Sequence, residues 1–468
     1  MSITSLGKQS IIYGAGTILG RLVTFLLIPV YTNALTTEHY GIISLIYTFL
    51  GFMNVILHYG LDASLLKNYV PADSNKKKAI LTNAYISFLI TGILFFIILF
   101  ILKDYISIFL FGINSAKIAI IVSGILFFDL LWSIHLLILR ANEKPIKFIL
   151  SNILNVTLLI TLNIHFVINM QLGVLGVVLS NLIASAILFF VTLPIILYNI
   201  KINTLSFSLW KKLMKFGMPF LPAGIFSMIL ELSDRYILKY LTNIETVGLY
   251  NAGYKFGMII LILVTAFNMG WQPFFLKTKK NIQHIPKITT YFISILCFFW
   301  IFLLIWIDTI ITIQVGDFLL LGAEYWESIK IIPIIAGAYI FQGVYVLQLP
   351  PIYLEEKSYF LIIVRGAGAL INIILNFILI PKIGIMGAAI STLLAFFSMA
   401  TILFYINKTI INIYYEWTKI GFLILICSLF ILIIVNYDLS IINKILLTTA
   451  YPLLLVILKI TPINKIKL

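Results

Sequence analysis

Long apolar runs alternate with short polar segments along the whole chain. Each run holds about 20 residues, the length that an α-helix needs to cross a hydrocarbon core of roughly 30 Å. The pattern predicts fourteen spans, at residues 11–33, 41–63, 79–102, 117–139, 147–168, 174–198, 216–239, 247–270, 287–307, 329–352, 359–380, 384–406, 417–436 and 440–459. The chain is therefore predicted to be an all-α, polytopic membrane protein.

Basic residues are distributed unevenly among the polar connections. If the N-terminus is cytoplasmic, the inner connections carry 22 Lys and Arg residues and the outer ones carry 6. A miscounted span would exchange the two sides beyond it, so this asymmetry supports both the count and the orientation. We expect both termini to be cytoplasmic.

Composition agrees with this pattern, since 62% of the 468 residues are hydrophobic and only 10% are charged. The net charge of +15 follows the inner connections, and no nucleic-acid recognition motif accompanies it. The sequence holds no metal-ligand spacing, nucleophile elbow, Walker loop or dinucleotide fingerprint. We therefore expect neither cofactor, metal, nucleic-acid partner nor enzymatic activity.

Two parts of the chain resemble each other. A shift of 207 places residues 36–49 over 243–256, a shift of 211 places 173–184 over 384–395, and Glu143-Lys144 matches Glu356-Lys357 at 213. This pattern predicts six-helix bundles at 1–200 and 211–407, followed by two further helices at 416–460. Because six is even, both bundles enter the membrane in the same direction and can rock about a central cavity, which is the geometry of a transporter.

A charged cluster lies in the seventh predicted span, where a charge is costly. Glu231, Asp234, Arg235 and Lys239 have the spacing of one helix face. For Asp234 and Arg235, mutual neutralisation and a role in substrate binding remain equally open. Pro219, at the start of the same span, predicts a kink.

Three further bases, Arg21, Lys255 and Arg365, lie inside other spans. They outnumber the acid most central to a span, Asp129, and predict a cationic cavity suited to a phosphate-bearing anion. Asp129 and Asp62 either partner these bases or carry a coupling proton, and the sequence leaves both interpretations open.

Several motifs resemble those of a known family. The segments are Asp234-Arg235-Tyr236-Ile237-Leu238, Val247 to Lys255, Asn372 to Asn376, Ile380 to Ala389, Tyr31 to Gly41, and Trp271 to Phe274. Together they resemble bacterial oligosaccharide flippases (Wzx-type) of the multidrug/oligosaccharidyl-lipid/polysaccharide exporter superfamily.

This resemblance implies a MATE-like fold in the bacterial inner membrane. The implied substrate is an undecaprenyl-pyrophosphate-linked oligosaccharide, such as an O-antigen or capsule unit, moved from the cytoplasmic to the outer leaflet. Membrane lipid and a downstream polymerase or ligase are the implied partners. We expect sugar contacts from Tyr254, Asn251 and Asn268. Alternatives are a cation-coupled multidrug exporter, a peptidoglycan-precursor flippase and, from another class, a glycan polymerase or ligase.

Overall fold

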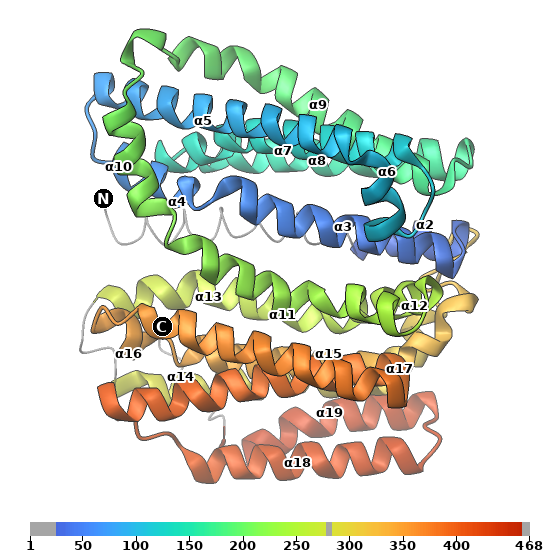
Figure 1. Cartoon of the computed structure of the whole chain (residues 1–468). Coiled ribbons are helices and arrows are strands. Elements are labelled where there is room, and N and C mark those ends of the chain that lie inside the picture. Colours follow the sequence, from blue (N-terminus) through green and yellow to red (C-terminus); the bar gives the residue numbers. More distant parts are fainter. Residues whose placement is uncertain (1–24, 278–282, 461–468) are drawn as a thin grey trace. The chain divides into compact units, whose positions relative to one another are not determined.

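The computed structural model describes residues 25–277 and 283–460, and most of them lie in helices (Figure 1). The chain forms two compact units, Met1–Asn251 and Ala252–Leu468. The first predicted span falls largely on residues 1–24, outside the described ranges. Every later predicted span coincides with helical residues, which confirms the all-α membrane fold.

The first unit is built from helices that follow one another with short turns. Its elements are α2 (Ile28–Ala34), α3 (Thr37–His58), α4 (Leu61–Tyr69), α5 (Ser74–Ile101), α6 (Lys103–Ile106), η1 (Ser107–Phe111), α7 (Ala116–Ala141), α8 (Pro145–Asn163), η2 (Ile164–Asn169), α9 (Gly173–Asn199), η3 (Ile202–Thr204), α10 (Phe207–Gly217), α11 (Phe220–Leu241) and the start of α12 (Ile244–Gly257).

Local chemistry explains several helix ends in this unit. The Thr36 hydroxyl accepts a hydrogen bond from the His39 N–H and begins α3, and the Asp73 carboxylate does the same for the Lys76 N–H at α5. Pro219 lies at the break between α10 and α11, which are bent by 44°. The proline-dependent kink expected there is thus present.

The second unit continues from α12. Its elements are α13 (Ile259–Lys277), α14 (Ile285–Ile311), β1 (Gln314–Val315), β2 (Phe318–Leu319), η5 (Ala323–Ile331), α15 (Ile332–Leu347), α16 (Pro350–Leu354), α17 (Tyr359–Ile410), α18 (Trp417–Asn436) and α19 (Ile441–Ile457). The two strands form an antiparallel hairpin within the predicted outer connection after α14.

Two predicted spans follow each other within α17, on either side of a kink. The 52-residue helix has non-helical backbone at Ile383 and Gly384, where Gly384 has φ 55°. Glycine adopts this left-handed conformation without a Cβ clash, so the chain changes direction there without a separate loop.

Span counting by length and composition gives ten candidates among the described residues, or eleven if α10 and α11 form one bent span. The prediction of fourteen differs for clear reasons. The first span is outside the described ranges, α17 counts once, and α19 has only 17 residues.

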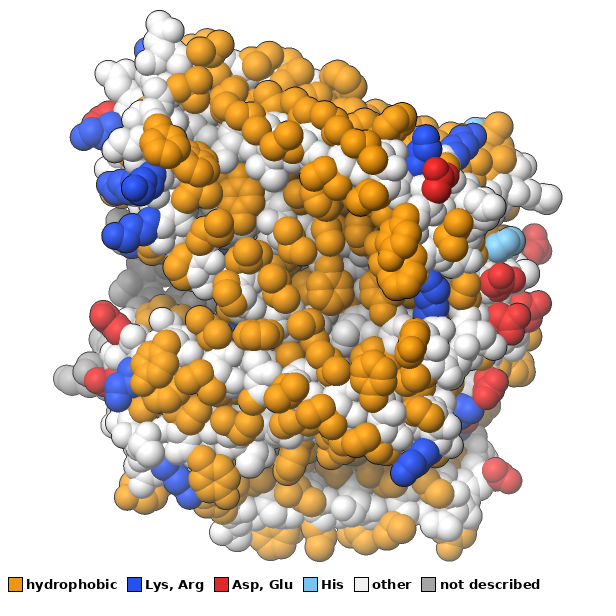
Figure 2. Space-filling model, in the orientation of Figure 1, with side chains coloured by type: hydrophobic (Ala, Val, Ile, Leu, Met, Phe, Trp, Pro, Cys, Tyr) orange, Lys and Arg blue, Asp and Glu red, His pale blue; other side chains and the backbone are white. Residues whose placement is uncertain are grey.

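The surface of the helices fits a lipid environment. Figure 2 shows hydrophobic side chains over the middle of the helices, and Lys, Arg, Asp and Glu gathered toward helix ends. Exposed apolar residues such as Ile101 and Ile424 would be costly in water and are favourable against acyl chains.

The matched sequence segments share backbone geometry. Glu143 and Glu356 both have positive φ, 53° and 54°. The residue after each donates its N–H to a carbonyl five residues earlier, Lys144 to Leu139 and Lys357 to Ile352, both at 2.9 Å. The turn therefore recurs in structure as well as in sequence, while the boundaries of the two predicted bundles stay a prediction.

The starts of α3 and α12 cross closely within the first unit. A Cβ on Gly41 would overlap the Ile244 carbonyl oxygen, and a Cβ on Gly248 would overlap the Thr37 carbonyl oxygen. The shift of 207 relates Gly41 to Gly248 and Thr37 to Ile244. Each of the two matched segments therefore contacts the other in the same way. Only glycine permits this approach.

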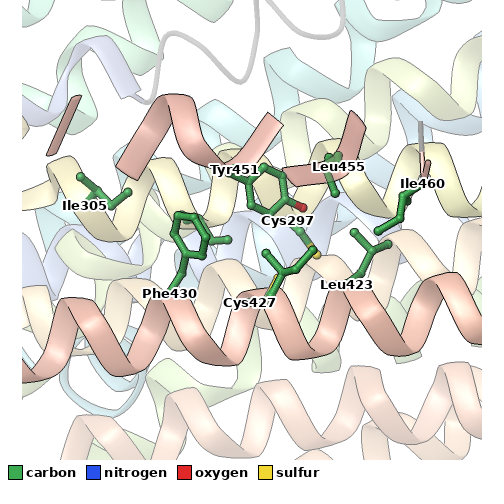
Figure 3. Packing of buried hydrophobic residues seen from close by; sticks show 10 residues of the cluster. Cys297, Ile305, Leu423, Cys427, Phe430, Tyr451, Leu455 and Ile460 are labelled. Atoms are coloured by element: carbon green, nitrogen blue, oxygen red, sulfur yellow. The ribbon is translucent and has the colours of Figure 1, made fainter. Parts of the chain in front are cut away.

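The last two helices attach to α14 through a buried apolar cluster (Figure 3). Cys297 of α14 and Cys427 of α18 lie together beside Tyr451 of α19, whose hydroxyl donates to the Ser294 carbonyl at 3.1 Å. Both cysteines are free thiols. Their role here is packing, as small apolar side chains.

Candidate functional site

The charged cluster of α11 is buried in the first unit. Asp234 and Arg235 are 0% and 2% exposed, so both ionisable groups lie away from bulk solvent. The Tyr250 hydroxyl of α12 donates to Asp234 Oδ2 at 2.6 Å, and the Arg235 guanidinium lies 5.4 Å from the centroid of the Tyr250 ring. The acid and the base are therefore both held by one aromatic side chain.

Further contacts extend this cluster to α3 and to the preceding turn of α11. Arg235 donates to the Glu231 carbonyl one turn earlier, and Glu231 itself is partly buried. Tyr40 of α3 lies near Arg235, and the Asn251 side chain hydrogen-bonds Tyr40. Burial and satisfied hydrogen bonds are typical of groups that hold helices together. This geometry favours a structural role for Asp234 and Arg235.

Lys239 lies at the end of the same helix and is partly buried. Its ammonium donates to the carbonyl oxygens of Phe109 and Leu110 at 2.5 and 3.2 Å. These carbonyls belong to the π-helical turn η1, so Lys239 ties α11 to that turn.

In the second unit, α12 continues with two predicted site residues. Tyr254 is 2% exposed, and its hydroxyl is 2.7 Å from that of Tyr339 on α15. Lys255 follows it and is partly buried. Asn268 of α13 is partly buried as well. Tyr254 therefore has a structural partner, while Lys255 and Asn268 keep part of their surface accessible.

Arg365 lies in the first part of α17 among tyrosines. Its Nε donates to the Tyr345 hydroxyl at 3.3 Å, and Tyr353 lies close enough to interact with its charge. The side chain is partly buried, so its guanidinium is neither sealed in the core nor fully open. Arg365 therefore has a hydroxyl partner in Tyr345, and its role in binding an anion stays a prediction.

The candidate acids lie in the first unit. Asp129 of α7 accepts from Trp132 Nε1 at 3.1 Å and hydrogen-bonds Ser185 of α9. Asp62 at the start of α4 is partly buried near His58, whose ring nitrogens bond the Asn54 carbonyl and the Ser133 hydroxyl. Within the described part of the chain Asp129 is thus held by neutral groups. The role of either acid as a charge partner or proton carrier stays a prediction.

Arg21 lies outside the described residues, so its predicted role in substrate binding stays a prediction. Among residues 25–277 and 283–460, no group of three His, Cys, Asp or Glu side chains is arranged to hold a metal ion. The sequence identified the charges but missed their tyrosine partners. Tyr250 stands in the motif after α11, and its position within that motif was the available signal.

A family model described as polysaccharide biosynthesis protein matches residues 6–279, more than half of the chain. No curated protein sequence gives a significant match.

Solved structures share the fold at low sequence identity. A structure described as lipid II flippase MurJ in an inward closed conformation has a TM-score of 0.77 and 16% identity, covering 96% of this chain and 100% of that chain. An outward-facing multidrug resistance transporter of the MATE family has a TM-score of 0.60 and 13% identity, covering 86% and 95%. A transporter of the MOP superfamily from Pyrococcus furiosus has a TM-score of 0.55 and 14% identity, covering 86% of this chain and 95% of that chain.

These findings agree with the motifs in the sequence. The shared fold is that of flippases and transporters, and the apolar helices identify a multi-pass membrane protein. The chain belongs to the polysaccharide biosynthesis protein family.

Proposed function

We propose that this protein moves an undecaprenyl-pyrophosphate-linked oligosaccharide from the cytoplasmic to the outer leaflet of the bacterial inner membrane by alternating access. The observation that carries the proposal is the pair of partly buried bases, Lys255 and Arg365, inside membrane helices of a polysaccharide biosynthesis protein. A pyrophosphate group in bare hydrocarbon is prohibitively costly, and fixed positive charges lower that cost.

The distribution of charge supports the proposed orientation of the protein in the membrane. Inner connections carry most of the basic residues, which is the pattern expected when both termini are cytoplasmic. The polyprenyl tail remains in lipid while the headgroup crosses among the helices. Within this proposal, Asn251 and Asn268 offer amide groups to sugar hydroxyls.

The test is the leaflet distribution of the lipid-linked glycan in cells that depend on this protein. Lys255→Gln and Arg365→Gln are each expected to lower the outer-leaflet glycan about tenfold or more, because glutamine removes the charge and keeps a polar side chain. Arg21→Gln is expected to do the same. Lys408→Gln is the matched control, since Lys408 is an exposed base on the same helix as Arg365.

Wild-type glycan export in the Arg21, Lys255 and Arg365 variants would refute the anion-binding model. Accumulation of a peptidoglycan precursor, instead of a repeat-unit lipid, would favour a second candidate function, the flipping of that precursor. This candidate is included because the MurJ structure with the same fold is described as a lipid II flippase.

A further inference from the structure

A crevice of about 420 Å³ lies between the middle of α5 and α10. It is confined to the first unit, where α10 runs beside the start of α5 (Figure 1). The lining residues are Asn83, Ile86, Ser87, Ile90, Thr91, Leu205, Ser206, Phe207 and Trp210. None of them belongs to the candidate site for substrate described above.

The polar groups in this lining already bind one another. Trp210 Nε1 donates to Ser87 Oγ at 2.9 Å, and the Tyr59 hydroxyl is 2.7 Å from the same oxygen. Asn83 Oδ1 accepts from the Ser206 N–H, and Asn83 Nδ2 donates to the Thr204 carbonyl. These internal bonds leave a mainly apolar surface for an occupant. A sugar would find few hydrogen-bonding groups there.

The mouth of the crevice is open and hydrophobic. Ile90 is 53% exposed and Phe207 is 75% exposed, and the Phe207 ring stacks on Trp210. A large aromatic side chain held outward beside a groove offers contact area to a hydrocarbon chain.

Basic residues flank the lining residues along the chain. They are Lys77 and Lys78 near the start of α5, Lys201 before η3, and Lys211, Lys212 and Lys215 on α10. Residues 74–101 and 199–217 contain no Asp or Glu. Clustered lysines next to a membrane helix attract anionic lipid headgroups.

The acid nearest in sequence, Asp73, already has a partner. Its carboxylate lies 3.3 Å from the Lys76 ammonium. A hydrogen bond from the Lys76 N–H holds the pKa of Asp73 below its usual value, so this acid stays charged and offsets Lys76. The other lysines of residues 74–101 and 199–217 have no acid within their own segments to offset them.

The distance along α5 matches one lipid leaflet. Lys78 and Ile90 are twelve residues apart, which is about 18 Å at a rise of roughly 1.5 Å per residue. Half of the hydrocarbon core is about 15 Å thick. A phosphate at the lysines would therefore place an acyl chain beside Ile86 and Ile90.

We propose that this crevice binds one anionic phospholipid. An acyl chain lies among Ile86, Ile90, Leu205 and Phe207, and the lysines of α5 and α10 hold the phosphate. Both halves of this ligand have matching surface, apolar for the chain and basic for the headgroup. The site is independent of the transported substrate.

The test compares two photoactivatable lipids in nanodiscs that contain the full-length protein. The probes are phosphatidylglycerol and phosphatidylcholine with the same diazirine-bearing acyl chain, and mass spectrometry maps the adducts. We expect phosphatidylglycerol to label residues 83–91 and 205–210 several times more strongly than phosphatidylcholine does. Equal labelling by the two probes would overturn the proposal.

Two sets of variants separate the chain from the headgroup. Ile90→Trp fills the crevice and is expected to remove the labelling, while Ile97→Trp, two turns further along α5 and 48% exposed, leaves it unchanged. A quadruple variant combines Lys77→Gln, Lys78→Gln, Lys211→Gln and Lys212→Gln. It is expected to abolish the preference for phosphatidylglycerol. Lys103→Gln combined with Lys117→Gln is the control for charge elsewhere in the unit.

Competition identifies the occupant. Unlabelled phosphatidylglycerol is expected to displace the probe. Displacement by undecaprenyl pyrophosphate alone would assign the crevice to a polyprenyl tail and would overturn the proposal. The readout is binding, so its outcome does not depend on whether the proposed transport function holds.

Discussion

At the scale of single residues, the motif Asp234-Arg235 combines two charges that the sequence alone could not assign to a role. Their spacing predicted one helix face, and both lie buried on α11. The environment that favours packing comes from Tyr250, 16 positions beyond Asp234, while a role in substrate binding stays a prediction. Hydropathy places residues on helices but does not specify which hydroxyl reaches which carboxylate. Tertiary contacts were therefore the part that could not be predicted.

Burial predicts different consequences for the two arginines. Arg235→Gln would remove a buried guanidinium that donates to the Glu231 carbonyl and lies over the Tyr250 ring, and the loss of a hydrogen bond from a charged group costs about 1.5 to 3 kcal/mol. We expect this variant to yield little folded protein by size-exclusion chromatography in detergent. Arg365→Gln, whose side chain is partly buried among tyrosines, is expected to fold normally and to fail in glycan export.

Tyr240→Phe provides a control for the effect of substitution on α11, because Tyr240 is 80% exposed. If Arg235→Gln were as well folded as this control, the structural role of Arg235 would be refuted.

At the scale of helices, apolar run length was a reliable guide, and so were the breaks marked by proline and glycine. The run at 417–436 coincides with α18, because flanking polar residues mark both of its ends. The break at Pro219 was expected from proline. The break between the two spans of α17 was expected from Lys382 and Gly384, which are typical of a turn, and the backbone is non-helical at Ile383 and Gly384. What the sequence did not indicate is that the two helices follow each other across a kink, without a longer loop.

Close packing of α3 on α12 gives a prediction at the same scale. Gly248→Ala would push a methyl group into the Thr37 carbonyl, and such overpacking costs about 1 to 3 kcal/mol. We expect a lower unfolding temperature for Gly248→Ala and for Gly41→Ala, measured on purified protein in detergent.

Gly421→Ala is the matched substitution, since a Cβ at this position in α18 meets no atom within 4 Å. It is expected to leave the unfolding temperature unchanged or to raise it, because alanine favours a helix over glycine by about 1 kcal/mol. Equal losses in all three variants would show that the crossing is not tightly packed.

At the scale of the whole molecule, the family and the fold agree with the all-α membrane protein that the apolar runs predict. Sequence reasoning reached this scale most easily, because the hydrophobic requirement of a bilayer applies to every span. The first compact unit extends to Asn251, because the start of α12 packs on α3, and the ends of the predicted bundles stay a prediction.

The predicted orientation can be measured with an impermeant maleimide on intact cells. Asp317→Cys lies in the exposed turn of the hairpin and is expected to react from outside. Glu143→Cys lies in an exposed turn of a predicted inner connection and is expected to react only after permeabilisation. The native thiols give little background, because Cys297 and Cys427 are 7% and 6% exposed. Labelling of Glu143→Cys in intact cells would show that the orientation is opposite to the predicted one.

The matching turns at Glu143 and Glu356 have a consequence for ancestry. They keep the same backbone dihedral angle and the same hydrogen bond, although most residues around them differ. If they descend from one gene duplication, the ancestral gene encoded a protein about half as long. Two identical copies of that protein, inserted in the same direction, would have been needed to do what one chain does now.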